Sequence, residues 1–340
     1  LEKLRRGMWL MIREGATEHN LEELAPIVKE NEARSSRCMM VSDDLTARYL
    51  RDVGHMDEKI RRAVRLGISP LVALRMVTLS TAEYFGWRDL GAVAPGRFAD
   101  LVAVDSLENC SVMKVWKRGR LVAENGKLAG PAVPRVAPPV LAAGALSVPE
   151  ESFFHLPLPA GAKIRVVGLR RGQVVTEHLV MEPTMRNGMA SADPERDLAY
   201  LAVLEKNRGS GRLAVGFVHG LGLKEGAICS SVAHDAHNFV AAGMDIPSLR
   251  RAFALLIEQG GGIAAVRGDT VLASLALPVG GLMNPSPADA VISGFEEVER
   301  AAATLGTDVN HPFMAMSFLS LSVIPELKLT DQGYVDLGRG

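Results

Sequence analysis

Two adjacent carboxylates, Asp43 and Asp44, directly follow the apolar run CMMV at positions 38–41. Neighbouring like charges repel each other, and burying either one is costly unless a cation or hydrogen-bond donors compensate it. A carboxylate beside a divalent cation stays ionised and can accept a proton from an attacking water. The pair is therefore either a solvated turn or helix cap, or it belongs to a catalytic site.

Three further polar residues occupy similar places. Arg13 and Glu14 follow the apolar run GMWLMI at positions 7–12, and His55 precedes a helical pattern. Arg13 and Glu14 could contact a substrate or form a structural ion pair. His55 could contact a substrate or cap the helix that follows it.

Two strand–helix units must position these residues. The apolar runs 7–12 and 38–41 read as short strands, and apolar residues at helical spacing predict a helix in 20–32 and another in 56–67. Strands separated by a helix favour a parallel α/β fold, and in (β/α)₈ barrels the reactive groups lie at the C-terminal ends of strands. Asn20 is the predicted N-cap of the first helix.

A further helix is predicted over 69–86, with Ser69 as N-cap and Pro70 at its first position. After residue 86 the pattern changes from helical spacing to short alternating runs. Turn signals at 94–96, at Gly119 and at Asn125-Gly126 separate short alternating runs, which predicts β-hairpins. The predicted organisation therefore has four parts: barrel units over 1–85, a small β subdomain over 86–128, a linker over 129–153 and an α+β domain over 154–340.

Composition narrows the class of partner. The chain has 340 residues with a formal net charge of −1, so its balance argues against a nucleic-acid partner and favours a small molecule. Cys38, Cys110 and Cys229 lie far apart, which predicts a reducing, cytoplasmic setting without a disulfide framework. No signal peptide and no apolar run of membrane-spanning length is present, so no membrane partner is predicted.

Several longer strings carry a family resemblance. The segment GAVAPGRFADLVAVD (91–105) is similar to the one by which metal-dependent amidohydrolases return from their barrel to a flanking β subdomain. The string MIREGATEHNLEELAPIVKENEARSSRCMMVSDDL (11–45) resembles the adenine deaminase family more specifically. GFVHGLGLKEGAICSSVAHDAHN (216–238) and FMAMSFLSLSVIPELKLTDQG (313–333) are similar to the C-terminal domain of that family.

This resemblance implies a fold and a reaction. The chain looks like the C-terminal part of an amidohydrolase (β/α)₈ barrel with its β subdomain, followed by the family's α+β domain. The implied activity is hydrolytic deamination of adenine to hypoxanthine and ammonia, which belongs to purine salvage. The implied cofactor is a divalent metal, manganese or iron, with most ligands outside this chain, because the family's His-x-His pair does not occur in it. A homo-oligomer is also expected.

The resemblance also assigns roles. Asp43 is expected to bind or face the metal and to handle a proton of the attacking water. Asp44 is expected to be catalytic as well, either by bonding a purine nitrogen or by orienting Asp43. Arg13, Glu14 and His55 are the candidate substrate-binding residues.

Other interpretations stay open. The chain could belong to another amidohydrolase, such as a cyclic amidohydrolase or an N-acyl deacetylase, or it could be a non-catalytic binding or assembly fragment. His234, Asp235 and His237 form a His-x-x-His string without an evident third metal ligand, so a structural or interfacial role is favoured for them. Two apolar stretches, 277–285 and 313–325, predict that the last domain packs on the barrel or on a second subunit.

Overall fold

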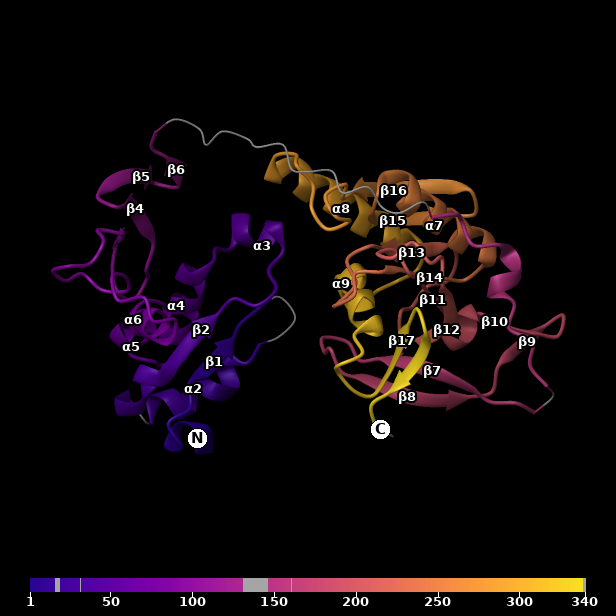
Figure 1. The fold of residues 1–340 in the computed structure, drawn as a ribbon, viewed down its shortest axis with the longest axis horizontal. Helices are drawn as coiled ribbons and strands as arrows, with labels where there is room; N and C mark the ends of the chain where they lie inside the picture. Colours follow the sequence, from indigo (N-terminus) through magenta and orange to yellow (C-terminus); the bar gives the residue numbers. More distant parts are fainter. Residues whose placement is uncertain (16–18, 31, 131–145, 160, 339–340) are drawn as a thin grey trace. The chain divides into compact units, whose positions relative to one another are not determined.

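The apolar side chains gather into three clusters, one confined to residues 4–110 and two to residues 154–329. The computed structural model describes residues 1–15, 19–30, 32–130, 146–159 and 161–338. By its contacts the chain divides into two units, Leu1–Arg135 and Val136–Gly340, each of which is described by itself (Figure 1). Most of the predicted linker, residues 131–145, lies outside the described residues.

Two parallel strands form the centre of the first unit. Strand β1 (Leu10–Arg13) pairs in parallel with β2 (Cys38–Val41), so that Arg13 lies opposite Val41. Helix α2 (Leu21–Lys29) and the 3₁₀ helix Glu32–Arg37 make the crossover between them, as a parallel pair requires. The described residues thus show the α/β unit that the sequence predicts, while the complete barrel stays a prediction.

Helix α3 (Ala47–Asp52) buries none of its residues. Other short helices cover this strand pair: α1 (Glu2–Arg5), α4 (Met56–Arg65), α5 (Pro70–Val77) and α6 (Leu79–Tyr84). Their inner faces bury Ile60, Ala63 and Met76 against the strands. The single helix predicted over 69–86 is wrong, because the backbone leaves the helical region at Thr78 and divides it into α5 and α6. Ser69 precedes α5, but its side chain makes no capping hydrogen bond.

A four-stranded antiparallel sheet follows in the same unit, in the order β3 (Leu101–Val104), β4 (Val112–Lys117), β5 (Arg120–Glu124) and β6 (Lys127–Leu128). Its two tight turns, Arg118-Gly119 and Asn125-Gly126, have positive φ at both residues. That geometry is the type I′ hairpin turn, which Asn-Gly favours. Both hairpins predicted from these turn signals are confirmed.

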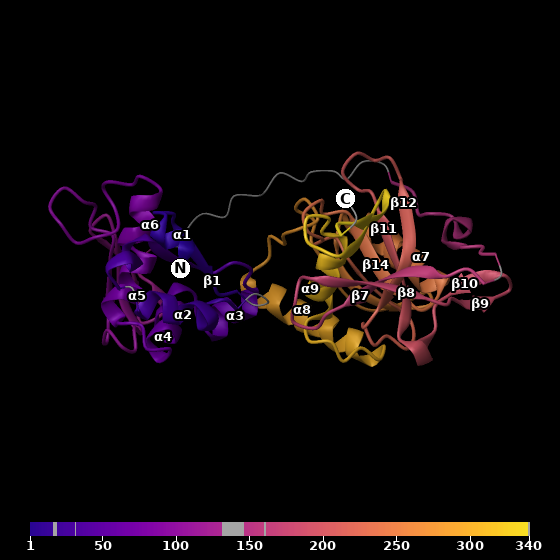
Figure 2. The same cartoon turned by 90° about the horizontal axis from the view of Figure 1, so that it is seen from below.

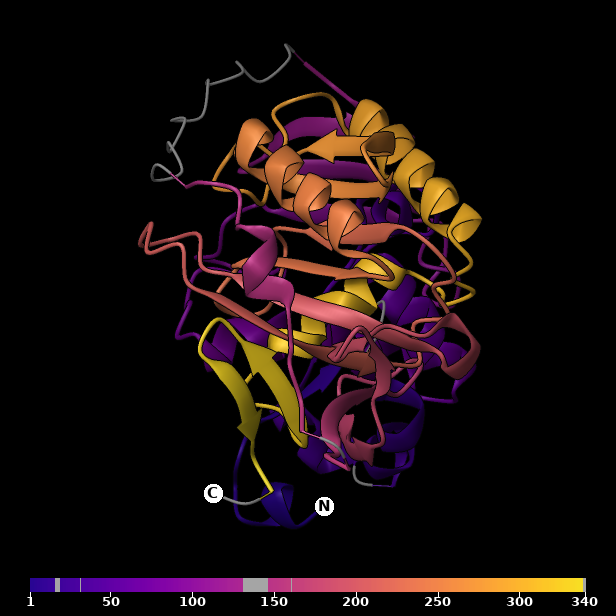
Figure 3. The same ribbon diagram turned by 90° about the vertical axis from the view of Figure 1, so that its right-hand side faces the viewer.

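An eight-stranded sheet dominates the second unit (Figure 3). Its spatial order is β16 (Thr270–Ala276), β15 (Gly262–Arg267), β13 (Ala227–Ser230), β14 (Phe239–Gly243), β11 (Leu198–Leu204), β12 (Leu213–His219), β7 (Ile164–Leu169) and β8 (Thr176–Met181). Only β12 and β7 pair in parallel among these strands, and their pairing is limited to two residue pairs. A small antiparallel pair, β9 (Thr184–Arg186) and β10 (Met189–Ser191), stands apart from this sheet.

Helices cover both faces of the large sheet, which therefore has a core on each side (Figure 2). Alternate residues of β11 point to opposite faces, as the pleat requires. Tyr200 packs in the cluster of α7 (Ile246–Gln259), whereas Leu201 packs in the cluster of α8 (Ala288–Thr304) and α9 (Pro312–Ser317).

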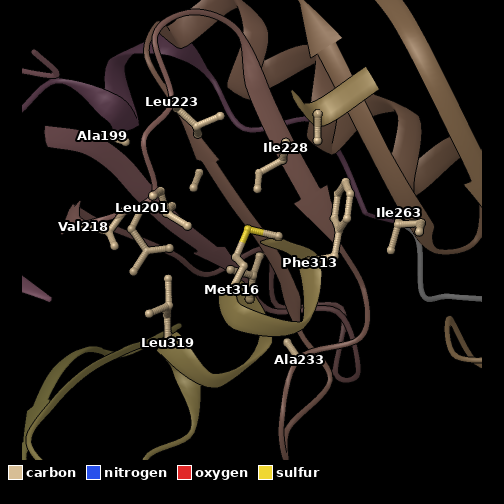
Figure 4. Close-up of a cluster of buried hydrophobic side chains, with 14 of the residues drawn as sticks. Ala199, Leu201, Val218, Leu223, Ile228, Ala233, Ile263, Phe313, Met316 and Leu319 are labelled. Atoms are coloured by element: carbon tan, nitrogen blue, oxygen red, sulfur yellow. The ribbon is translucent and has the colours of Figure 1, made fainter. Parts of the chain in front are cut away.

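The stretch 313–325 supplies core residues to its own unit. Phe313, Met316 and Leu319 are at most 3% exposed and pack against Leu201 and Val218 of the sheet (Figure 4). For its first half, the apolar character that predicts packing on the barrel or on a second subunit is therefore explained by the core of its own unit. None of the helices in the described ranges is both long and apolar enough to cross a membrane.

A hairpin of β17 (Leu327–Thr330) and β18 (Gly333–Asp336) forms a separate pair of strands that packs against β7 and β12 of the large sheet. The Tyr334 hydroxyl accepts a hydrogen bond from Phe217 N (2.8 Å) and donates one to the Arg165 carbonyl (2.8 Å). Gly216 lies beneath this hydroxyl, and a Cβ there would overlap it. Burial raises the pKa of Tyr334 to about 12, so the hydroxyl keeps its proton over the physiological range.

Candidate active site

The register of β1 and β2 brings two of the predicted site residues together. Because Arg13 ends β1 opposite Val41, its guanidinium reaches Asp43 just beyond β2, with 3.5 Å between Nη1 and Oδ2. The side chains are 46% and 36% exposed. An ion pair this open to water stabilises the fold by about 1 kcal/mol at most. Asp43 therefore remains accessible to a ligand.

Asp43 has a left-handed backbone, with φ of 52°. Aspartate tolerates this conformation better than most residues, although it still costs free energy relative to the helical or extended regions. The next helix, α3, is capped by Thr46, whose Oγ1 accepts a hydrogen bond from Tyr49 N at 3.1 Å. The aspartates are thus not the N-cap of that helix, and the plain helix-cap interpretation of the pair loses its support.

Asp44 packs closely over the end of the neighbouring strand. A Cβ built on Gly15 would lie 2.5 Å from Asp44 Oδ1 and 3.0 Å from the Asp44 carbonyl oxygen. Only a residue without a side chain leaves room for the carboxylate there. Gly15 therefore fixes where Asp44 can lie.

Glu14 is buried, with 1% of its surface exposed, and is bonded on both carboxylate oxygens. Oε1 lies 2.8 Å from His19 Nδ1 and 3.0 Å from the Arg62 guanidinium. Oε2 accepts the backbone N–H of Leu21 at 3.1 Å, the first residue of α2. Of the two roles considered for Glu14, this geometry favours the structural ion pair.

Asn20 does not cap α2 as the sequence predicts. Its side chain makes no capping hydrogen bond, and its Oδ1 instead accepts one from Arg13 Nε at 3.2 Å. The capping acceptor is the Glu14 carboxylate, which reaches the helix from the end of β1. One buried carboxylate therefore ties the strand, the following helix and α4 together.

His55 lies apart from the Asp pair in its contacts. It is the N-cap residue of α4, yet its exposed ring makes no capping hydrogen bond. Asp57 accepts the His55 backbone N–H at 2.8 Å and pairs with Arg61 at 2.9 Å. Burial raises the pKa of Asp57, but these hydrogen bonds and the Arg61 charge outweigh it and lower that pKa overall.

A second polar cluster escaped the sequence analysis. Lys59 has a fully buried side chain whose Nζ lies 3.1 Å from Glu58 Oε2 and 3.1 Å from the Tyr49 hydroxyl. Its ammonium also lies 4.5 Å from the centre of the Tyr49 ring, a cation–π contact. One signal was present: Lys59 lies one helical turn from Met56 and Ala63, inside the apolar stripe of α4.

The described residues do not make up a metal site by themselves. No group of three or more His, Cys, Asp or Glu side chains in this part of the chain could hold an ion. Asp43, the residue predicted as a ligand, could supply one carboxylate oxygen. The donor set thus fits a metal only if further ligands come from outside the described residues.

The chain matches two family models. Residues 173–340 match the adenine deaminase C-terminal domain, and residues 6–122 match the amidohydrolase family. An adenine deaminase of Oleidesulfovibrio alaskensis is 44% identical over 338 residues, and one of Desulfatibacillum aliphaticivorans is 40% identical over 337. The chain is therefore similar to adenine deaminases over nearly its whole length.

The alignments cover this chain far more completely than they cover the relatives. The two alignments take in 99% of this chain but only 58% of each relative. An adenine deaminase of Geobacillus kaustophilus is 38% identical over 343 residues and is covered to 59%. The chain thus spans a little over half the length of the curated relatives that it matches.

Two solved structures align with part of the chain. A β-aspartyl dipeptidase from Fervidobacterium islandicum aligns with a TM-score of 0.32 and 20% identity over 38% of this chain and 37% of that chain. An amidohydrolase from Thermotoga maritima aligns with a TM-score of 0.22 and 19% identity over 36% and 39%.

Proposed function

We propose that this chain takes part in the hydrolytic deamination of adenine, in which water replaces the amino group at C6 and the products are hypoxanthine and ammonia. The observation that carries the proposal is Asp43, a partly exposed carboxylate at the end of a parallel strand that does not serve as the N-cap of the next helix. The similarity of the chain to curated relatives named adenine deaminases supports it.

Asp43 is the proton-transfer residue in this proposal. It accepts a proton from the attacking water and passes it towards the departing amino group. A divalent cation, when bound, would lower the pKa of water so that it can attack at neutral pH. Asp43 lies far enough into solvent to offer one oxygen to such a cation, and Arg13 holds it at 3.5 Å without burying it.

The neighbouring residues have supporting roles. Asp44, fixed against Gly15, either orients Asp43 or bonds a purine nitrogen. Glu14 acts as a positioning residue, because its bonds to α2 and to Arg62 hold the end of β1. Arg13 and His55 remain the proposed contacts to the substrate. Glu14 is no longer proposed as a substrate contact, because both of its carboxylate oxygens are already bonded within the protein.

The remaining assignments belong to the same proposal. The cofactor is a divalent metal, manganese or iron, and the small-molecule substrate is adenine. We expect a homo-oligomeric, cytoplasmic enzyme that binds neither nucleic acid nor membrane, with a role in purine salvage.

The test is a pair of carboxylate-to-amide variants in the longest form of the protein that deaminates adenine when loaded with manganese or iron. An amide keeps the shape of the carboxylate but cannot take a proton at neutral pH. Asp43→Asn should lower kcat by at least about 100-fold with little change in KM, because the proton moves only in the transition state. If Asp44 bonds the purine, Asp44→Asn should mainly raise KM.

Asp52→Asn is the matched control. Asp52 ends α3 and pairs with Arg51 on the surface, so its loss should leave both constants within about twofold. A near-normal kcat for Asp43→Asn would remove Asp43 from the mechanism. Equilibrium dialysis with adenine and Mn²⁺ tests the assembly-fragment interpretation. If the chain binds neither of them, that interpretation is favoured instead.

A further inference from the structure

Three basic side chains gather at one end of the large sheet in the second unit. The loop 231–238 joins β13 to β14 and carries His234 and His237, whose ring centres are 5.9 Å apart. His234 stacks on Phe318 with 5.0 Å between ring centres and 13° between planes. Lys206, just after β11, stands beside the end of this loop, since its backbone N–H donates to Asn238 Oδ1 at 3.2 Å.

The acidic groups around this cluster are engaged elsewhere. Glu205 accepts hydrogen bonds from Arg208 N (2.6 Å) and Ser210 N (3.0 Å). Asp331 pairs with Arg212 at 2.9 Å and accepts from Asn238 Nδ2 at 3.2 Å.

Asp235 lies 3.9 Å from His234, but its side chain is 76% exposed. Among the described residues no carboxylate neutralises Lys206, which is only 7% exposed and donates to the Gly280 carbonyl at 2.7 Å. Burial lowers the pKa of Lys206. Burial, and then the nearby His234 and Lys206, lower the pKa of His237. The cluster is therefore an excess of basic groups.

Hydrogen-bonding capacity also remains open in the cluster. An ammonium has three N–H donors, and Lys206 uses one of them on Gly280. His237 Nδ1 is buried and has no hydrogen-bond partner in the part of the chain that is described. Buried polar atoms in folded proteins are nearly always paired, so an unpaired one calls for a partner that the chain does not supply.

The backbone around the cluster is held in place before any ligand arrives. The His234 N–H donates to the Ser317 carbonyl (3.1 Å), and the His237 N–H donates to the Ala233 carbonyl (2.7 Å). The amide of Asn207 donates to the Ala236 carbonyl at 2.6 Å. Pre-organised groups lose little entropy on binding, which favours a ligand site over a mobile loop.

We propose that Lys206, His234 and His237 form a binding site for a small oxyanion, a phosphate or a carboxylate. Oxyanions accept several N–H donors at once and compensate unneutralised positive charge. A metal site fits less well, because a third His, Cys, Asp or Glu ligand is missing among the described residues and the lysine would repel a cation.

The test is binding of inorganic phosphate and of acetate to the full chain, each at constant ionic strength with chloride as the reference. Isothermal titration calorimetry gives the affinity, and the C2–H resonance of His237 in NMR spectra reports its pKa. We expect saturable binding that tightens from pH 8 to pH 6, and a rise in the pKa of His237 when the oxyanion is bound. Binding of phosphate alone, or of both anions, identifies which oxyanion the site takes.

Two variants connect the binding to these residues. Lys206→Met and His237→Asn should each weaken the affinity at least tenfold, and asparagine tolerates the positive φ of position 237, which is 50°. Lys206→Arg keeps the charge and should retain most of the affinity, which separates loss of charge from loss of folding. Lys163→Met and His155→Asn, both outside the cluster, should change nothing. Equal responses to chloride and phosphate, or an unchanged affinity in Lys206→Met, would overturn the proposal.

Discussion

The two units handle buried charge in different ways. In the first unit, buried Glu14 pairs with Arg62 at 3.0 Å, and buried Lys59 pairs with Glu58 at 3.1 Å. In the second unit, the fully buried Lys328 has no acidic partner among the described residues. Its Nζ donates to the carbonyls of Val174 (2.8 Å) and Phe318 (3.0 Å).

The difference has a physical consequence. An opposite charge offsets the cost of taking an ion out of water, whereas carbonyl dipoles offset less of it. Burial accordingly lowers the pKa of Lys328 to about 8. In these two pairs of the first unit, removing one member leaves the other charge buried without its partner. The second unit keeps basic groups whose protonation is more easily changed.

The largest expected effect on stability is at the ion pair of buried Glu14 with Arg62 in the first unit. Glu14→Gln removes the charge that Arg62 faces and weakens the cap of α2, so the free energy of unfolding should fall by about 3 kcal/mol. Glu22→Gln is the control, because Glu22 is 73% exposed and lies 4.0 Å from the same arginine. Urea unfolding of both variants measures the difference. Equal, small losses would show that Glu14 is not a structural anchor.

The second effect concerns a neutral polar bridge. Tyr334→Phe removes the hydroxyl that joins Phe217 N to the Arg165 carbonyl, and Phe217 N then loses its partner in a partly buried place. The expected loss is about 2 kcal/mol, measured by thermal or urea unfolding. Tyr200→Phe, which removes a single hydrogen bond to the Ala190 carbonyl, should cost about half as much. The reverse order would contradict the bridging role.

The third effect is the pH dependence of stability that the buried lysine of the second unit, Lys328, should cause. The folded-state pKa of Lys328, about 8, lies below the unfolded value of about 10.4, so above pH 8 the unfolded chain binds more protons than the folded one. Stability should therefore gain about 1 kcal/mol from this group between pH 8 and pH 9. Lys328→Met should remove this rise, and Lys163→Met should not. Parallel profiles for wild type and Lys328→Met would refute the assignment.

The smallest effect is expected at the exposed pair in the candidate site. Arg13→Gln should change the free energy of unfolding by about 0.5 kcal/mol or less, because its pair with Asp43 is open to water. Differential scanning fluorimetry at low and high salt is sufficient to detect it. A loss above about 2 kcal/mol would mean that the pair is structural rather than available to a ligand.

Local signals predicted much of the fold. The Asn125-Gly126 turn specifies its own hairpin, and the strand ends of 7–12 and 38–41 placed Arg13 and Asp43 in one region, where they are found in contact. These features depend on residues close in sequence or on the direction of parallel strands.

The contacts that sequence alone could not predict are long-range choices among equivalent residues. Helix α4 carries Arg61, Arg62 and Arg65, and only packing decides that Arg62 meets Glu14. The same carboxylate displaces Asn20 as the cap of α2, because it reaches the helix from the neighbouring strand. The roles of Asp43, Asp44 and His55 stay predictions, since the geometry of a site without its ligand does not test them.

The Tyr334 bridge also constrains the order of events during synthesis. The residues that it joins, Phe217 and Arg165, are 117 and 169 positions earlier in the chain. On a ribosome, strands β7 and β12 therefore emerge long before the tyrosine that spans the gap between them. Until the hairpin forms, the parts of β7 and β12 that do not pair with each other keep exposed edges. Such edges are open to pairing with other chains.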